Sequence, residues 1–289
     1  MGFERHILHF LPECAEFDPQ LGYSLKPGHC RFQNPEYDHD IFVNSAGLRD
    51  REEALDRPAI VVTGDSFAMG WGVAQSETLS AVLAELTGER TLNAARPSYG
   101  TAREMLLLSL LDLTAAHTLV IQYCENDYTE NTVLLRDPGW LRTMTPETYR
   151  AMVAQHLGAT RYWPGKHLRH MLPLLWWSAR GDVPPEPRDC PIDARVFLDV
   201  LDRGRLPRPL RVVAFEATYT VDQRACFGRA LEDLAARRTL PEWISELRVI
   251  DPASFLTAAD YYPIDEHLNA AGYRKIAAAV AGVLSERAR

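Results

Sequence analysis

A serine stands at the end of a short apolar run, where its side chain could do chemistry. Residues 59–62 carry no polar side chain, which is typical of a strand buried on both faces of a parallel sheet. The run stops at Gly64, Asp65 and Ser66, and an amphipathic helical pattern follows. Ligands bind at the carboxyl edge of such a sheet, so the Ser66 hydroxyl and N–H are predicted to face a cleft. Taken alone, the stretch also fits a plain Gly-Asp-Ser turn.

A base and an acid that could serve Ser66 lie near the C-terminus. A serine hydroxyl is a weak nucleophile and needs a base within hydrogen-bond reach. Of the nine histidines, only His267 has an acid two residues away in a loop that leads to a helix. Because residues i and i+2 of an extended chain point the same way, Asp265 is predicted to hold His267 through Nδ1 while Nε2 faces Ser66. Ile264 cannot orient an imidazole, and Glu266 is expected to point elsewhere. An ordinary surface turn ahead of the helix is the alternative.

A third group of polar residues follows the buried strand predicted over 118–123. Acyl transfer needs hydrogen-bond donors aimed at the developing oxyanion. The side-chain amide of Asn126 and the N–H of Ser66 are predicted to be two of them, and the turn at 93–100 should supply a third. Asp127 is interpreted as structural. A glycosidase pair made of Glu125 and Asp127 is a disfavoured alternative, because residues two apart on one turn do not straddle a glycosidic bond.

These blocks, in this order at strand ends, resemble the SGNH (GDSL-type) serine hydrolase family over roughly residues 58–285. The chain departs from the family pattern in three places. Ser98 and Cys124 stand where the family usually has glycine. The acid precedes the histidine by two residues rather than the more common three, as in relatives that resemble polysaccharide O-acetyltransferases. The resemblance implies an oxyanion hole drawn from four residues, with the last as a fallback: Ser66, Asn126, Ser98 and Gly100.

The elements that must position these residues alternate from residue 58 onward. Alternating strands and helices predict right-handed crossovers and a three-layer αβα sandwich with a parallel central sheet. The resemblance implies the same architecture, the flavodoxin-like SGNH hydrolase fold. The predicted strands cover about 59–63, 90–94, 118–123, 210–216 and 247–251, and the predicted helices cover about 76–88, 101–114, 222–238 and 269–286.

Two parts of the chain fall outside this alternation. Residues 1–57 are interpreted as an irregular N-terminal cap with one short strand near 40–45, placed before a hydrolase domain over 58–289. Residues 128–209 are too long for a simple connection and are interpreted as an aromatic-rich insertion of two or three helices over the cleft. Its basic side chains could touch anionic lipid or substrate, or form a solvated helix face packed on the sheet. They are Arg161, Lys166, Arg169 and His170.

Composition excludes several classes of protein. A chain of 289 residues with 46% hydrophobic content can bury one core, which favours one domain with an insertion. The net charge of −8 argues against a nucleic-acid binder. Five cysteines without C-x-x-C spacing argue against structural zinc and a disulfide framework. Cys14 and Cys30 are expected to be free thiols, and to pair only if the protein is exported. Residues 38–40 are interpreted as a solvated turn rather than a metal site.

No targeting or membrane segment is recognisable in the sequence. Residues 6–11 are too short and too polar for the apolar region of a signal peptide. The longest apolar run, 171–179, is too short to span a bilayer. The chain as written is expected to be soluble and cytoplasmic by default, or exported or anchored if a leader precedes it.

The residues together predict a serine esterase that cleaves a small acyl ester of a carbohydrate or lipid through an acyl-enzyme on Ser66. No metal or organic cofactor is expected. An O-acyltransferase that uses the same triad to acylate a sugar hydroxyl is one alternative, and a non-catalytic ligand-binding module is another. The expected partner is a small-molecule, glycan or lipid ester, and the insertion permits contact with a membrane surface. The acyl donor, the alcohol and the oligomeric state do not follow from the sequence.

Overall fold

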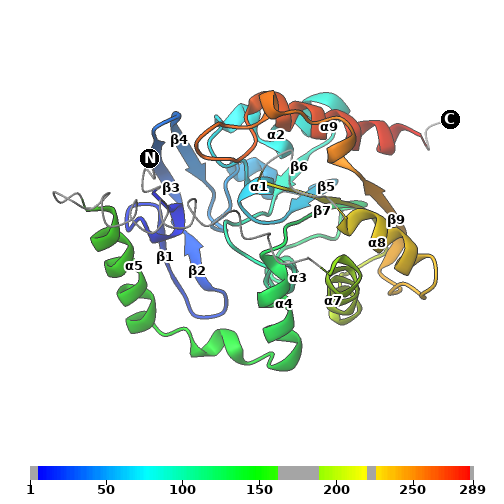
Figure 1. Ribbon diagram of the computed structural model, residues 1–289, viewed down its shortest axis with the longest axis horizontal. Coiled ribbons are helices and arrows are strands. Elements are labelled where there is room, and N and C mark those ends of the chain that lie inside the picture. The colour runs from blue at the N-terminus through cyan, green and yellow to red at the C-terminus, as the bar shows by residue number, and fades with distance from the viewer. Residues whose placement is uncertain (1–5, 162–188, 220–225, 287–289) are drawn as a thin grey trace, which may run out of the picture.

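The computed structural model describes residues 6–161, 189–219 and 226–286. At its centre lies a five-stranded sheet in which every neighbouring pair of strands is parallel (Figure 1). The strand order β6-β5-β7-β8-β9 is 2-1-3-4-5 in chain order, the flavodoxin-like arrangement. The predicted fold class is confirmed. The strands are β5 (Ile60–Thr63), β6 (Thr91–Asn93), β7 (Thr118–Tyr123), β8 (Leu210–Glu216) and β9 (Ile244–Ile250).

Helices cover both faces of the sheet, which is why all residues of its central strands are buried. Along β5, Ile60 and Val62 pack in the cluster with α2 and α9, whereas Val61 packs in the cluster with α3, α7 and α8. Figure 1 shows the two helical layers on opposite sides of the sheet. The helices are α2 (Leu79–Thr87), α3 (Thr101–Leu108), α4 (Asp127–Arg136), α7 (Cys190–Arg203), α8 (Phe227–Ala235) and α9 (Ala270–Ser285).

The predicted bounds of two helices differ from the observed ones for local reasons. The helix predicted over 76–88 begins at Leu79, because Thr78 adopts an extended conformation and its side chain caps the N–H of Ala81. The helix predicted over 101–114 ends at Leu108. Beyond it Asp112 accepts the N–H of Thr114, which turns the chain toward β7.

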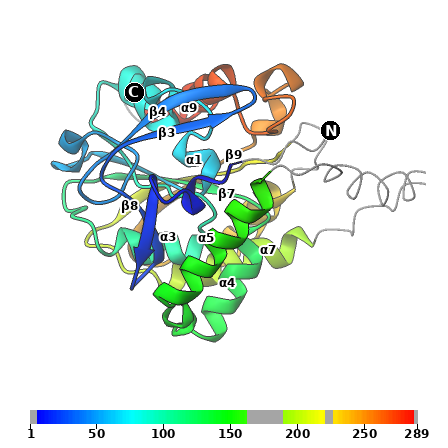
Figure 2. The same cartoon turned by 90° about the vertical axis from the view of Figure 1, so that its left-hand side faces the viewer.

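The N-terminal segment is not the irregular cap that we predicted. It forms two antiparallel hairpins, and the second lies across the molecule near the short helix α1 (Ser66–Met69) in Figure 2. Alternate residues of β3 are buried, namely Cys30, Phe32 and Asn34, and the polar residues between them are exposed, so the strand has a period of two that our prediction did not use. The strands are β1 (Ala15–Asp18), β2 (Gly22–Leu25), β3 (Gly28–Asn34) and β4 (Tyr37–Val43).

Two disulfides also correct an expectation. Cys14 pairs with Cys30 and Cys190 pairs with Cys226, while Cys124 is a buried free thiol. The free thiols expected at Cys14 and Cys30 are therefore wrong. The partners are 16 and 36 residues apart in the chain, and only the packing of β3 and of α7 brings them together.

The described part of the predicted insertion includes α4 and α5 (Pro146–Thr160). Helix α5 packs against the N-terminal segment, where the Tyr149 hydroxyl donates to the carbonyl of His9 at 2.9 Å (Figure 1). Arg161 follows this helix directly. The other three basic positions of the insertion lie outside the described residues. Within the described ranges, no helix is both long and apolar enough to cross a membrane.

Candidate active site

Ser66 is the first residue of α1 (Ser66–Met69), directly after β5. The turn between them needs a glycine, since Gly64 has a φ of 148° and a Cβ there would lie 2.5 Å from Oε1 of Gln122. The same Gln122 oxygen accepts the N–H groups of Asp65 and Ala68 at 3.0 and 3.1 Å. Because a helix leaves the N–H of its first residue unbonded, the Ser66 N–H is available to a ligand.

His267 and Asp265 meet Ser66 as the sequence predicted. Oγ of Ser66 lies 2.9 Å from Nε2 of His267, and Nδ1 of His267 lies 2.6 Å from Oδ1 of Asp265. All three residues are buried. A proton on Nδ1 is shared with the carboxylate, which leaves Nε2 able to accept the serine proton. The three side chains thus have the geometry of a Ser-His-Asp triad.

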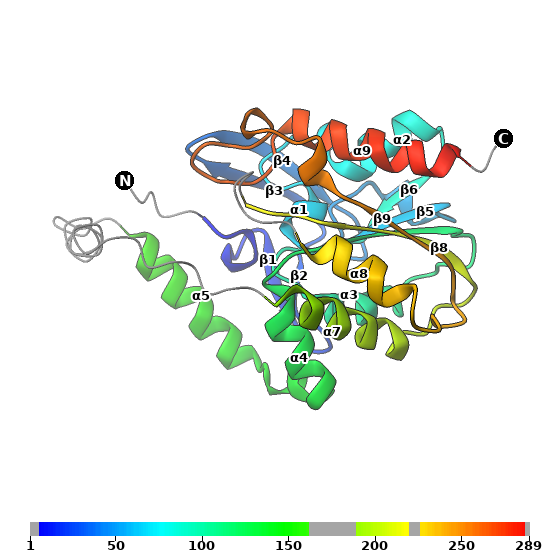
Figure 3. The ribbon, with the colours of Figure 1, turned by 45° about the vertical axis from the view of Figure 1, so that its right-hand side comes forward.

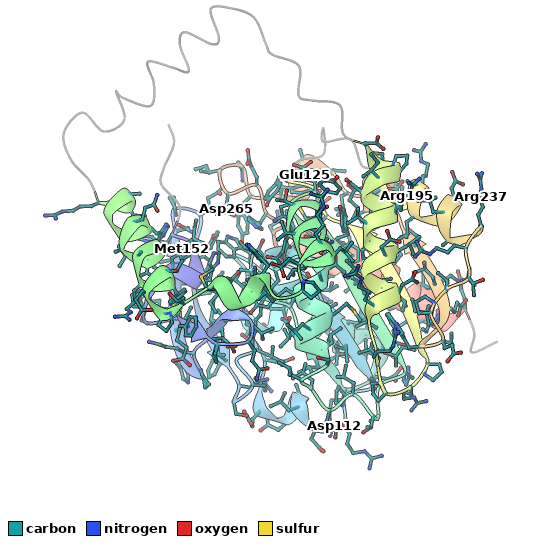
Figure 4. All side chains as sticks on the ribbon, turned by 90° about the horizontal axis from the view of Figure 1, so that it is seen from below. Asp112, Glu125, Met152, Arg195, Arg237 and Asp265 are labelled. Atoms are coloured by element: carbon teal, nitrogen blue, oxygen red, sulfur yellow. A yellow bond between two sulfur atoms is a disulfide. The ribbon has the colours of Figure 1, made fainter. Side chains whose placement is uncertain are left out.

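The backbone between Asp265 and His267 is not the extended segment that we expected. Glu266 has a φ of 65° and its N–H bonds to the carbonyl of Tyr262 at 2.9 Å, so this stretch is a tight turn. The turn brings Asp265 and His267 to one side and leaves Glu266 exposed, pointing elsewhere as predicted, and Ile264 is exposed as well. Figure 4 shows Asp265 and Glu125 toward one end of the molecule and Asp112 at the other. Glu125 follows β7 and Asp112 precedes it, so Asp265 lies at the carboxyl edge of the sheet.

Three aromatic rings surround the His267 imidazole, and sequence reasoning missed all of them. Phe67 and Trp71 follow Ser66 closely in the chain, with ring centroids 4.6 and 5.2 Å from His267. Tyr219, three residues after β8, approaches edge-on at 5.7 Å. An aromatic residue just past the carboxyl end of a predicted strand was the available signal. The rings shield the histidine from water, and His267 is accordingly buried.

The predicted oxyanion donors have different surroundings. Asn126 is exposed, and its amide donates to Oδ2 of Asp65 at 3.4 Å, which ties it to the turn that carries Ser66. Ser98 is also exposed, with a φ of 59° in a turn closed by the Tyr99 N–H on the carbonyl of Arg96. A residue with this φ is most often glycine, and glycine is the residue that the family resemblance implied at position 98.

The turn that contains Ser98 lies beside the Gly-Asp-Ser turn, because the Arg96 N–H donates to the carbonyl of Gly64 at 3.1 Å. Gly100 is placed differently. Its N–H donates to Oε1 of Glu130 at 2.9 Å, so it is occupied and unsuited to the fallback role. Ser98 therefore remains the candidate for the third donor.

Comparison with known proteins adds little to this geometry. No family model matches the chain, and no curated protein matches it. One similar solved structure is a protein assigned to the G-D-S-L family of lipolytic proteins from Desulfitobacterium hafniense DCB-2. It is 14% identical, with a TM-score of 0.39, over 78% of this chain and 99% of that one. Similarity at this level establishes no family, so the relation is at most distant.

A group of buried carboxyls lies behind the candidate triad. Asp127 accepts the hydroxyl of Thr101 at 2.9 Å, which joins α4 to α3 and agrees with the structural role predicted for it. Asp65 accepts the Phe67 N–H and is fully buried. Burial raises the pKa of both carboxyls, and for Asp127 the neighbouring charge of Asp65 raises it further. Among the described residues, no three such side chains are grouped so as to hold a metal ion.

Glu104 on α3 belongs to the same group and was not singled out in the sequence. It is 0% exposed, and neither carboxyl oxygen has a hydrogen-bond partner among the described residues. Burial, and then the charges of Asp127 and Asp65, raise the pKa of Glu104 well above its usual value. A carboxyl whose pKa is raised by folding favours the folded state at low pH. This contribution is lost as the pH rises from the unfolded pKa toward the folded one.

Replacing Glu104 should therefore change the pH dependence of stability. Glu104→Gln keeps the shape of the side chain and removes its titration. Above about pH 4.3, the free energy of unfolding of the variant minus that of the parent should increase by up to about 1.4 kcal/mol per pH unit. Urea titrations from acid to neutral pH measure this difference. Glu130→Gln is the control, because Glu130 pairs with buried Arg103 and its loss should destabilise at neutral pH. If the difference in unfolding free energy between Glu104→Gln and the parent does not change with pH, Glu104 does not have the raised pKa assigned to it.

Proposed function

We propose that the protein is a serine hydrolase that cleaves an acyl ester through an acyl-enzyme on Ser66. The observation that carries the proposal is the continuous contact from Ser66 Oγ to His267 Nε2 and from His267 Nδ1 to Asp265 Oδ1. It lies at the ends of β5 and β7, where the strand order of the sheet reverses and where α/β folds bind ligands.

The proposed reaction has two halves. Ser66 Oγ attacks the ester carbonyl carbon while His267 Nε2 takes its proton, and Asp265 stabilises the imidazolium. The Ser66 N–H, the Ser98 N–H and the Asn126 amide are the proposed donors to the oxyanion. Collapse of the intermediate expels the alcohol, which takes the proton from Nε2. Water then attacks the acyl-enzyme, giving its proton to His267, and the released acid leaves Ser66 protonated again.

The aromatic rings around His267 support a small acyl ester of a carbohydrate or lipid as the substrate class. Phe67, Trp71 and Tyr219 pack around the His267 imidazole that contacts the nucleophile. Phe67 and Trp71 are buried, so Tyr219, which is partly exposed, is the ring proposed to meet an alkyl chain or the apolar face of a sugar. An O-acyltransferase remains the second candidate. The two-residue spacing of Asp265 and His267 favours it, and a sugar hydroxyl would replace water in the second half-reaction.

A screen of p-nitrophenyl esters from acetyl to dodecanoyl, with and without a sugar acceptor, tests the proposal. We expect turnover, release of free acid, and labelling of Ser66 by a fluorophosphonate, located by peptide mapping. Accumulation of acylated sugar over free acid would assign the transferase instead. An intact protein with neither turnover nor label at Ser66 would overturn the enzyme assignment and favour a binding module.

A further inference from the structure

The turn of the β3–β4 hairpin touches the loop that carries Asp265 and His267. The Glu36 carboxylate accepts the N–H of Ile264 at 3.0 Å and the N–H of Asp265 at 2.6 Å. Figure 3 shows this hairpin, in blue, beside the orange loop that precedes α9. The N-terminal segment therefore reaches the candidate active site, although 228 residues separate Glu36 from Ile264 in the chain.

Tyr37 makes the contact that concerns the triad itself. Its hydroxyl donates to Oδ2 of Asp265 at 2.9 Å, and the Asn34 amide donates to the same hydroxyl at 2.7 Å. One carboxylate oxygen of Asp265 thus bonds to His267, and the other accepts from Tyr37. Burial, and then the charge of Asp265, raise the pKa of Tyr37, so the phenol keeps its proton and remains a donor.

The surroundings of Tyr37 hold its ring in place. The ring packs against Phe32 and Tyr262, with centroids 5.5 and 5.3 Å away. Its other neighbour is Gly72, where a Cβ would lie 2.8 Å from the ring, so the glycine leaves room for it. Tyr37 is 6% exposed and Asp265 is 2% exposed. A hydrogen bond this well shielded from water restricts rotation of the carboxylate.

We propose that Tyr37 is a positioning residue for the hydrolase, which acts by fixing the Asp265 carboxylate toward His267. The inference rests on the proposed function. It makes the β3–β4 hairpin part of the active site rather than a cap over it. Without the phenol, the carboxylate can rotate away from Nδ1, and the imidazole is held in the productive orientation for less of the time.

A double-mutant cycle with Asp265 tests this inference. Tyr37→Phe keeps the ring and its packing and removes only the hydroxyl. We expect kcat on an activated ester to fall about tenfold with KM unchanged, as for loss of one hydrogen bond to a charged group. In the Asp265→Ala background the same substitution should change kcat less than about twofold, because there is no carboxylate left to position.

Tyr262→Phe is the matched control for this cycle. Its hydroxyl donates to the carbonyl of Gly72 at 2.7 Å and does not contact Asp265, so any loss should be equal in both backgrounds. Equal losses for Tyr37→Phe in both backgrounds, with Asp265→Ala itself strongly impaired, would overturn the Tyr37 proposal alone. If Asp265→Ala leaves kcat unchanged, the triad assignment fails and the Tyr37 proposal fails with it. Melting temperatures of all variants exclude loss of the fold.

Discussion

Ser66→Ala should abolish ester cleavage, with a loss of kcat on the order of 10⁶, as is typical when a triad nucleophile is removed. The reason is chemical, because the hydroxyl is the atom that becomes acylated. The fold should survive. The turn is held by Gln122 and by the Asp65 cap on Phe67, and neither uses the serine side chain.

Steady-state kinetics on an activated ester, with fluorophosphonate labelling and a melting curve, measure the effect of Ser66→Ala. Ser80→Ala is the matched control. Ser80 is also a buried serine, but it lies in α2, where its hydroxyl bonds to the hydroxyl of the N-cap residue Thr78. It should keep near-parental kcat and labelling. A Ser66→Ala variant that folds and turns over within about tenfold of the parent would remove Ser66 from the mechanism.

Asp265→Asn should lower kcat by about 10⁴-fold with little change in KM, the effect seen when a triad carboxylate becomes an amide. The structure adds a specific reason. Tyr37 donates to Oδ2, so the amide oxygen would be drawn to Tyr37 and the NH₂ would face Nδ1 of His267. The amide would then donate to Nδ1, the imidazole proton would move to Nε2, and the base could no longer accept from Ser66.

Full kinetics of Asp265→Asn separate this account from a Ser-His dyad. In a dyad, the backbone carbonyl of Asp265, 3.4 Å from Nδ1, would hold the histidine and the loss would be about tenfold or less. The carboxylate is closer, at 2.6 Å, so we expect the larger effect. Glu266→Gln, an exposed neighbour in the same turn, should leave kcat near the parental value. If Asp265→Asn loses only about tenfold or less in kcat, Asp265 has no catalytic role and Ser66 and His267 act as a dyad.

Much of the fold follows from local patterns in the sequence. All six residues of β7 are buried because helices cover both faces of the sheet, and that burial is why four of the six are apolar, with Thr118 and Gln122 as the polar exceptions. The helix that follows the last loop begins after Asn269, whose side chain caps two N–H groups as its residue type predicts. Ser66, Asp265 and His267 could be named in advance because each stands at the end of such an element.

The tertiary structure alone decided which distant residues touch. Tyr37 and Asp265 are 228 residues apart, and their contact depends on where the β3–β4 hairpin packs against the loop before α9. The Cys190–Cys226 disulfide and the contact between the rings of Tyr219 and His267 also join residues that are far apart in the chain. Periodicity and capping reflect forces that act over a few residues. Contacts between elements depend on strand order and on turns such as the left-handed Glu266, which no local period encodes.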